Sequence, residues 1–143
     1  MARYRASVNS TLSLEEAFAY MANFANAAQW DPSVVSATKV GTDPVGGGTA
    51  FDLVTEFRGR RVALHYEITT YEAPRKVVLT ARTPRLLSRD TITFESREGG
   101  TAMTYDAYLG LLGVARVLDP VLGIFFKQLG DAARDGLVRA LNP

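Results

Sequence analysis

The sequence predicts an α+β fold in which a curved antiparallel sheet of about seven strands holds one long C-terminal helix. Three observations indicate this fold. An amphipathic helix leads into Trp30-Asp31-Pro32, a long series of segments with strand periodicity follows, and an apolar helical segment closes the chain. Strands joined by short turns pair antiparallel, and one apolar face per strand means that one face of the sheet is covered. We expect the C-terminal helix to provide that cover, with a cavity between helix and sheet.

The first elements are a strand and two short helices. A strand is predicted over residues 3–11, where apolar and polar residues alternate. Ser13 with Glu16 three residues later forms a capping-box pattern, which starts an amphipathic helix. A second short helix over residues 23–29 ends at Asp31, because the proline that follows disfavours helical backbone in the residue before it.

Alternating apolar and polar residues predict strands over most of the chain from residue 34 to residue 109. The turns between these strands contain glycine or proline, as short connections require. The positions expected to face inward are Phe51, Leu53, Thr55, Phe57, Val62, Leu64, Tyr66, Ile68, Val77, Leu79, Ala81, Thr83, Ile92, Phe94, Met103, Tyr105, Ala107 and Leu109.

The last element is a long helix. Asp119 and Pro120 have the pattern of an N-cap followed by proline at the first helical position. Apolar residues at spacings of three or four mark the predicted buried stripe: Leu118, Leu122, Phe125, Leu129 and Ala133. Small residues up to Gly136 allow close approach to the sheet. Ile124 and Phe126 lie off this stripe, where they could border the cavity mouth or contact a partner.

Composition limits the class of protein. The 143 residues suffice for a single domain, residues 1–143, whose core needs no metal or disulfide. A net charge of +1 creates no general attraction for nucleic acid, and acidic neighbours dilute the basic cluster at residues 58–61. Cysteine is absent, which excludes thiolate chemistry. The N-terminus lacks a signal-peptide pattern and the apolar segment 109–129 is interrupted by charges, so we expect a cytoplasmic protein without a transmembrane segment.

Candidate catalytic residues are few. His65 is the only histidine, and alternation places it on the outer face of its strand, where it cannot act on a ligand inside. A lone histidine without cysteine makes no ordinary zinc site, so we expect neither metal nor cofactor. Glu15 and Glu16 lie in the first turn of a helix, Asp31 in a turn, and Asp90 at the start of a strand. We interpret all four carboxyl groups as structural, because no two of them are aimed at one point.

Several different local motifs are spread along nearly the whole chain. They are Leu14 to Phe18 with Phe24, Trp30-Asp31-Pro32, Gly46-Gly47-Gly48-Thr49, Tyr66-Glu67-Ile68 with Pro74, Arg89-Asp90-Thr91, Gly100-Thr101 and Tyr105. With the order of elements, they resemble the helix-grip fold of the START/Bet v 1-like (SRPBCC) superfamily. More narrowly, the chain is similar to the polyketide cyclase/dehydrase and lipid-transport family. The resemblance implies a cavity, with the glycine-rich loop either a gate at its mouth or a plain flexible turn. Such patterns specify fold better than function.

The function expected from this combination is binding of one small hydrophobic or aromatic ligand, such as a lipid or polyketide-like compound, in the cavity between sheet and helix. Tyrosine and threonine hydroxyls would orient the ligand, and Trp30 would provide a flat wall. The candidate ligand-binding residues are Trp30, Phe51, Leu53, Thr55, Tyr66, Leu79, Thr83, Tyr105, Leu122 and Phe125. For each of them, packing in a solid core is the alternative.

Two other classes of function stay open. An enzyme of the polyketide cyclase or dehydratase type could fold a flexible substrate in the same cavity, with a tyrosine moving a proton. The lack of an inward histidine or carboxylate in the predicted strands argues against this alternative. A non-catalytic interaction module, or a homodimer, would use an exposed apolar patch around Ile124 and Phe126.

Overall fold

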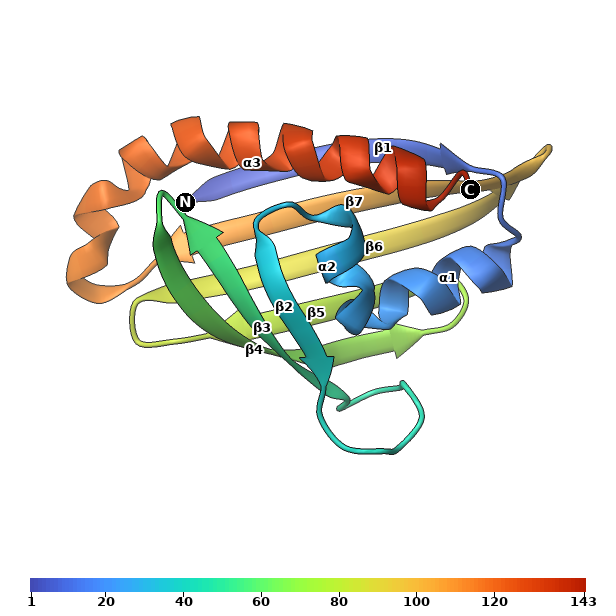
Figure 1. Cartoon of the computed structure of the whole chain (residues 1–143), viewed down its shortest axis with the longest axis horizontal. Helices are drawn as coiled ribbons and strands as arrows, with labels where there is room; N and C mark the ends of the chain where they lie inside the picture. Colours follow the sequence, from blue (N-terminus) through green and yellow to red (C-terminus); the bar gives the residue numbers. More distant parts are fainter.

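A computed structural model gives the backbone of the 143 residues and the side chains of residues 1–117 and 122–143. In this described part of the chain, seven strands form one antiparallel sheet in the order β1-β7-β6-β5-β4-β3-β2, which curls around the helices (Figure 1). The strands are β1 (Ala2–Ser10), β2 (Val34–Lys39), β3 (Ala50–Phe57), β4 (Arg60–Glu72), β5 (Lys76–Arg82), β6 (Leu86–Arg97) and β7 (Gly100–Leu111). The predicted sheet of about seven strands is confirmed.

The helices occupy two places along the chain. They are α1 (Leu14–Ala22), the 3₁₀ turn η1 (Phe24–Asn26), α2 (Ala27–Trp30), the 3₁₀ segment η2 (Gly113–Leu118) and α3 (Asp119–Ala140). The capping box of α1 is present: the Glu16 amide donates to the Ser13 hydroxyl and the Ser13 amide to the Glu16 carboxylate, both at 3.2 Å. The short helix predicted over residues 23–29 divides into η1 and α2, and Asp31 adopts extended backbone as its proline neighbour requires.

The hairpins follow the glycine pattern. Arg58 and Gly59 connect β3 to β4 with φ of 50° and 78°, the two positive values that a tight two-residue hairpin turn needs. Glu98 and Gly99 connect β6 to β7, and here Gly99 has a positive φ of 81° whereas Glu98 does not. Short turns keep strands that follow one another in the chain paired in the sheet. The inward positions of adjacent strands therefore lie next to each other across the sheet.

Helix α3 lies along β1 and beside α2 (Figure 1). A Cβ atom on Gly130 would collide with the Tyr4 ring on β1, and one on Gly136 would collide with the Trp30 carbonyl oxygen at the end of α2. Both glycines therefore allow the helix to approach closely. The close approach that small residues predict is thus made to β1 and α2.

The observed inward side of α3 differs in part from the predicted stripe. Leu122, Phe125, Leu129 and Ala133 are half-buried, as expected. Phe126, which was predicted to lie off the stripe, also faces inward. The side chain of Leu118 and the cap expected from Asp119 and Pro120 lie outside the described side chains.

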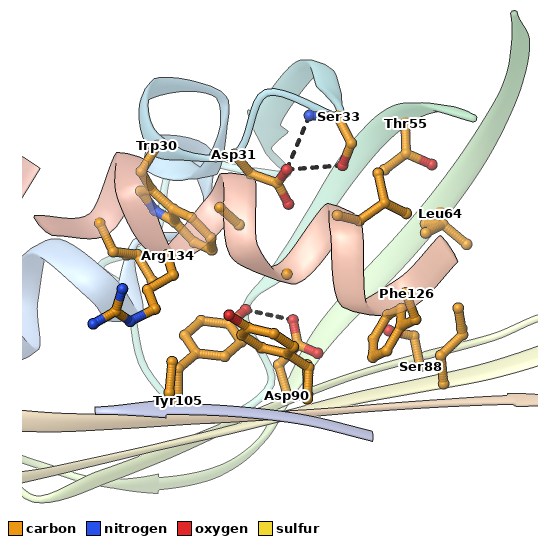
Figure 2. A pocket seen from close by; sticks show the side chains of 18 of the residues that line it. Trp30, Asp31, Ser33, Thr55, Leu64, Ser88, Asp90, Tyr105, Phe126 and Arg134 are labelled. Atoms are coloured by element: carbon orange, nitrogen blue, oxygen red, sulfur yellow. Dashed lines mark hydrogen bonds between the residues drawn. The ribbon is translucent and has the colours of Figure 1, made fainter. Parts of the chain in front are cut away.

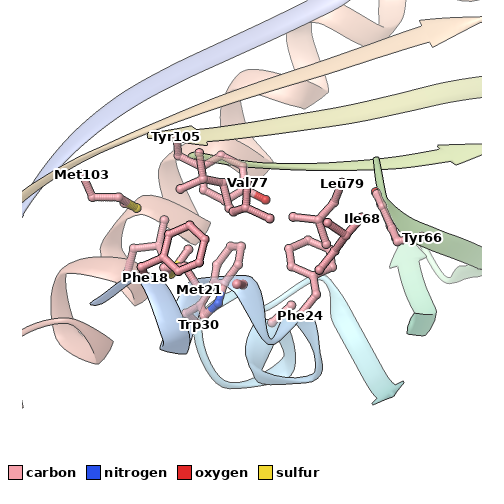
Figure 3. Close-up of a cluster of buried hydrophobic side chains, with 14 of the residues drawn as sticks. Phe18, Met21, Phe24, Trp30, Tyr66, Ile68, Val77, Leu79, Met103 and Tyr105 are labelled. Atoms are coloured by element: carbon pink, nitrogen blue, oxygen red, sulfur yellow. The ribbon is translucent and has the colours of Figure 1, made fainter. Parts of the chain in front are cut away.

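The space under the short helices is filled by a dense aromatic core (Figure 3). Phe24 contacts the Tyr66 ring edge-on at 5.1 Å between centroids, and Trp30 contacts Tyr105 in the same manner at 5.5 Å. Such T-shaped pairs are favoured because a ring edge is positive and a ring face negative. The core thus ends at Trp30, Tyr66 and Tyr105, which form the border with the space beneath α3.

Candidate functional site

A pocket of about 130 Å³ lies between the sheet and α3, next to the turn that follows α2. Figure 2 shows its side chains converging from both layers. Its walls are largely apolar: Trp30, Leu64, Leu86, Leu109, Phe126, Leu129 and Leu137. The pocket exists because α3 rests on β1 and α2 at glycines, while the curled strands β3 to β7 bend away beneath it.

Asp90 and Tyr105 form a hydrogen-bonded pair on the floor of this pocket. The Tyr105 hydroxyl donates to Asp90 Oδ2 at 2.5 Å, across the antiparallel pair of β6 and β7. Asp90 is only 7% exposed. Burial raises the pKa of Asp90 to about 7, because the charged carboxylate loses its water; Asp31 and Asp106 raise it further, and the bond from Tyr105 opposes the rise. The carboxyl group is therefore poised to exchange a proton near neutral pH.

A second polar pair lies beside the first. The hydroxyls of Tyr66 and Ser88 are 2.7 Å apart. Tyr66 on β4 and Ser88 on β6 both pair in register with Ala81 on the strand between them, and its methyl group is small enough for the tyrosine to reach across. Both residues are buried, and burial raises the pKa of Tyr66. These hydroxyls can orient a ligand but stay protonated.

Asp31 approaches the pocket from the opposite side. Its Oδ1 accepts bonds from the Ser33 amide at 2.9 Å and the Ser33 hydroxyl at 2.8 Å, which form the turn between α2 and β2. Burial raises the pKa of Asp31, and the bonds from Ser33 oppose that rise. In Figure 2 the Asp31 carboxyl lies above the pocket and that of Asp90 lies below it.

The structure places the ten predicted ligand-binding residues in four regions. Trp30, Thr55, Tyr66 and Tyr105 line the pocket together. Phe51, Leu53 and Leu79 lie in the aromatic core and not along the pocket, while Leu122 and Phe125 line a neighbouring groove. Thr83 lies in the turn after β5 rather than in a strand, and its hydroxyl accepts bonds from the Arg85 and Leu86 amides. Strand residues that were predicted from alternation to face inward thus divide into two groups: some lie in a filled core and others line a pocket.

The structural interpretation of Asp31 and Asp90 needs correction. Asp90 lies inside β6 rather than at its start, and both carboxyl groups face one pocket, although no such pair was expected. Alternation contained the signal: counting back from the inward residue Ile92 places Asp90 and Ser88 on the inner face as well. Both were overlooked because polar residues at strand starts usually belong to turns.

The groove lies on the side of the pocket nearest the β3–β4 hairpin. Leu122 and Phe125 of α3 form one of its sides, and the Arg58 guanidinium lies 3.8 Å from the centre of the Phe125 ring. Ser33, Phe57 and Leu129 line both the groove and the pocket, so they lie at the boundary of the two hollows. The groove therefore adjoins the pocket.

The glycine-rich loop is distant from both hollows. Residues 46–48 line neither of them, and the Gly48 amide donates to the Ile68 carbonyl at 2.9 Å, at the end of β3 opposite to α3 (Figure 1). The loop therefore has the position of a turn rather than that of a gate to the pocket under α3.

The outer surface carries no further chemical centre in the described residues. His65 is exposed on the outer face as predicted, with Nδ1 2.6 Å from Asp52 Oδ1. Among the described side chains, no three His, Asp or Glu residues gather in a way that could hold a metal ion. No helix in that part of the chain combines the length and apolarity needed to cross a membrane. Ile124 is 66% exposed, whereas Phe126 faces the pocket, so they do not form one surface patch.

Comparison with known proteins gives a family match over almost the whole chain. The family model described as polyketide cyclase / dehydrase and lipid transport matches residues 1–142. No curated protein matches the sequence.

Solved structures share the fold at low sequence identity. A START superfamily protein from Mycobacterium smegmatis has a TM-score of 0.79 at 11% identity, over 99% of this chain and 97% of that chain. The protein TTHA0849 from Thermus thermophilus has a TM-score of 0.76 at 13% identity, over 98% and 95%. The di-domain ARO/CYC BexL from the BE-7585A biosynthetic pathway has a TM-score of 0.63 at 16% identity, over 94% of this chain and 49% of that one. These likenesses confirm the helix-grip fold.

Proposed function

Because the chain belongs to the polyketide cyclase/dehydrase and lipid-transport family, we propose that the pocket beneath α3 binds one small apolar or aromatic molecule. The observation that carries this proposal is the character of the pocket. Apolar side chains form most of its walls, and several polar side chains line it as well, among them Asp31, Tyr66, Asp90 and Tyr105. Ligand sites typically combine an apolar lining with a few placed polar groups that fix orientation.

The size of the pocket limits the ligand. At about 130 Å³ it is close to the roughly 150 Å³ apolar cavity known to take up benzene in another protein, so it holds one aromatic ring without rearrangement. A longer ligand would extend into the groove past Phe57 and Leu129. The contact between Arg58 and Phe125 lies along this groove, and we place the access route there.

Filling the pocket from α3 tests this function. Ala133 is a half-buried pocket residue, and Ala133→Phe would occupy the space with a ring. We expect this variant to lose uptake of a one-ring probe such as benzyl alcohol, observed through the indole N–H resonance of Trp30, the single tryptophan. Ala63→Phe, the same change on the exposed face of β4, should leave uptake intact. Equal uptake by both variants would show that the probe binds elsewhere.

Native mass spectrometry of freshly purified protein gives an independent measurement. A discrete extra mass that disappears on denaturation would identify the molecule bound during expression. A wild-type protein that carries no extra mass and takes up no one-ring probe would contradict the proposed binding function.

A second candidate function is catalysis of the cyclase or dehydratase type on a polyketide-like chain. The specific observation in its favour is the pair of Asp90 and Tyr105, a carboxyl group with a pKa of about 7 bonded to a tyrosine inside the pocket. A group with such a pKa can accept and return a proton near neutral pH. If the protein is such an enzyme, Tyr105→Phe should abolish turnover of a linear poly-β-ketone substrate, while the substrate still binds. Unchanged turnover would remove Tyr105 from the mechanism.

A further inference from the structure

Two carboxyl groups face the pocket from opposite walls, and each leaves one oxygen for a ligand. Asp90, nine-tenths buried on β6, uses Oδ2 to accept the bond from Tyr105. Asp31, in the turn after α2, uses Oδ1 to accept both bonds from Ser33. Among the described residues, no protein donor bonds to Oδ1 of Asp90 or to Oδ2 of Asp31. Neither oxygen is sealed inside the protein, because Asn23 Oδ1 is the single fully buried side-chain nitrogen or oxygen without a bond among the described residues. Both oxygens can therefore accept a bond from a molecule in the pocket that they line.

Positive charge is missing around this pair in the described part of the chain. Neither carboxyl group forms an ion pair with a described lysine, arginine or histidine. Arg134 of α3 is the one cationic side chain among the described lining residues; it is exposed, and its guanidinium lies apart from both carboxyl groups in Figure 2. The neighbouring charges that act on Asp90 are those of Asp31 and Asp106, which are also negative. The pocket therefore has a negative potential that no described protein cation balances.

The aromatic walls favour the same kind of ligand group. Trp30 and Tyr105 meet edge to face at 5.5 Å beside Asp90, and the Tyr66 ring also lines the pocket. Ring faces attract cations through their quadrupole, most strongly for tryptophan and where water is excluded. Carboxylates and aromatic faces together are the surroundings that an ammonium group prefers.

We infer that the ligand of this pocket is an apolar or aromatic amine, whose ammonium group donates hydrogen bonds to the free oxygens of Asp31 and Asp90. This inference rests on the proposed function, because it defines the chemical class of the molecule bound there. The apolar body of the amine lies against Leu64, Phe126 and Leu129. Fatty acids and other carboxylates are disfavoured, since they would bring a third negative charge into a buried space.

The affinity for an amine should depend on pH. The titratable or charged groups that share the pocket with Asp90 are Tyr4 on β1, Asp31 after α2, Tyr66 on β4, Tyr105 on β7 and Arg134 on α3. Asp106, which pairs with the exposed Arg3, also acts on Asp90 electrostatically. With a pKa of about 7, Asp90 is ionised above neutrality and attracts an ammonium group, whereas below neutrality it is protonated and the attraction weakens. Preference for the amine should therefore increase as the pH rises through 7.

Three one-ring probes of nearly equal size separate charge from shape: benzylamine, benzyl alcohol and benzoate. Each is titrated into the protein while the Trp30 indole resonance is followed, at about pH 8 and about pH 5.5, on either side of the Asp90 pKa. At the higher pH we expect benzylamine to bind at least about tenfold more tightly than benzyl alcohol, since bonds to a buried charge are stronger than neutral ones. Benzoate should bind most weakly, and the preference for the amine should shrink at the lower pH.

Substitutions assign the preference to the two carboxyl groups. Asp90→Asn and Asp31→Asn should each reduce benzylamine affinity about tenfold while leaving benzyl alcohol affinity nearly unchanged, which also shows that the pocket is folded. Asp52→Asn, the same change on the outer face of the sheet, should alter neither affinity.

The outcomes distinguish the two proposals. Equal affinity for benzylamine and benzyl alcohol at about pH 8 would overturn the amine inference and leave the binding function standing. Tighter binding of benzoate would overturn it as well. If none of the three probes binds the folded wild-type protein, the proposed binding function itself fails.

Discussion

Replacing Asp90 with asparagine tests how the fold holds this carboxyl group. Burial raises its pKa from the ordinary 3.8 to about 7, so the folded chain binds this proton more tightly than the unfolded chain does. Between these two values the unfolded state has lost the proton while the folded state retains it. The free energy of unfolding must therefore fall as the pH rises from about 4 to about 7 and then level off.

The magnitude follows from the same pKa difference. A difference of one in pKa corresponds to about 1.4 kcal/mol, so the ionised carboxyl group of Asp90 destabilises the fold by about 4 kcal/mol above neutrality. Asparagine has nearly the same shape, and its amide oxygen can accept the bond from Tyr105. Relative to wild type, we expect Asp90→Asn to be more stable by up to about 4 kcal/mol at about pH 8 and to lose this advantage at about pH 4.

Urea unfolding followed by Trp30 fluorescence over this pH range measures the effect. Subtracting the wild-type curve from that of the variant removes the contribution of the other titrating groups. Asp52→Asn, on the exposed outer face, should give a difference that stays small throughout. A stability difference for Asp90→Asn that does not change with pH would refute the conclusion that this buried carboxyl group takes up a proton in the folded state.

Three further outcomes test the packing and the access route. Gly136→Ala should destabilise the protein by about 1–3 kcal/mol in urea unfolding, because its Cβ would meet the Trp30 carbonyl. Gly123→Ala, where space is open on the same helix, should instead stabilise it by up to about 1 kcal/mol; equal effects would contradict the close approach. Leu79→Ala should reduce stability by about 2–5 kcal/mol without changing benzyl alcohol affinity, since Leu79 lies in the core; a parallel loss of affinity would place it at the pocket. Arg58→Ala should speed probe exchange by about twofold to fivefold in NMR line-shape measurements, as the contact with Phe125 is lost, and an unchanged rate would place the access route elsewhere.

The sequence alone determined the local features of this protein. The capping box of α1, the hairpin turn at Arg58 and the outward position of His65 follow from rules that involve only nearby residues. Alternation also assigned the inner faces of the strands, because side chains of a strand point to opposite faces by turns. The same rule places Asp90 inward, although its acidic character suggested a loop.

Only the tertiary structure decided which inward residues border a pocket. Leu79 and Tyr66 both point inward, but the short helices α1 and α2 cover Leu79 with core side chains, while Tyr66 lies at the border of the space under α3. The course of α3 depends on its contacts at Gly130 and Gly136, with partners more than a hundred residues away in the chain. The pairing of Asp90 with a carboxyl group from the turn after α2 depends on that docking as well. Periodicity along a strand states which face a residue occupies, but the depth of its burial is set by the elements that the rest of the chain lays across that face.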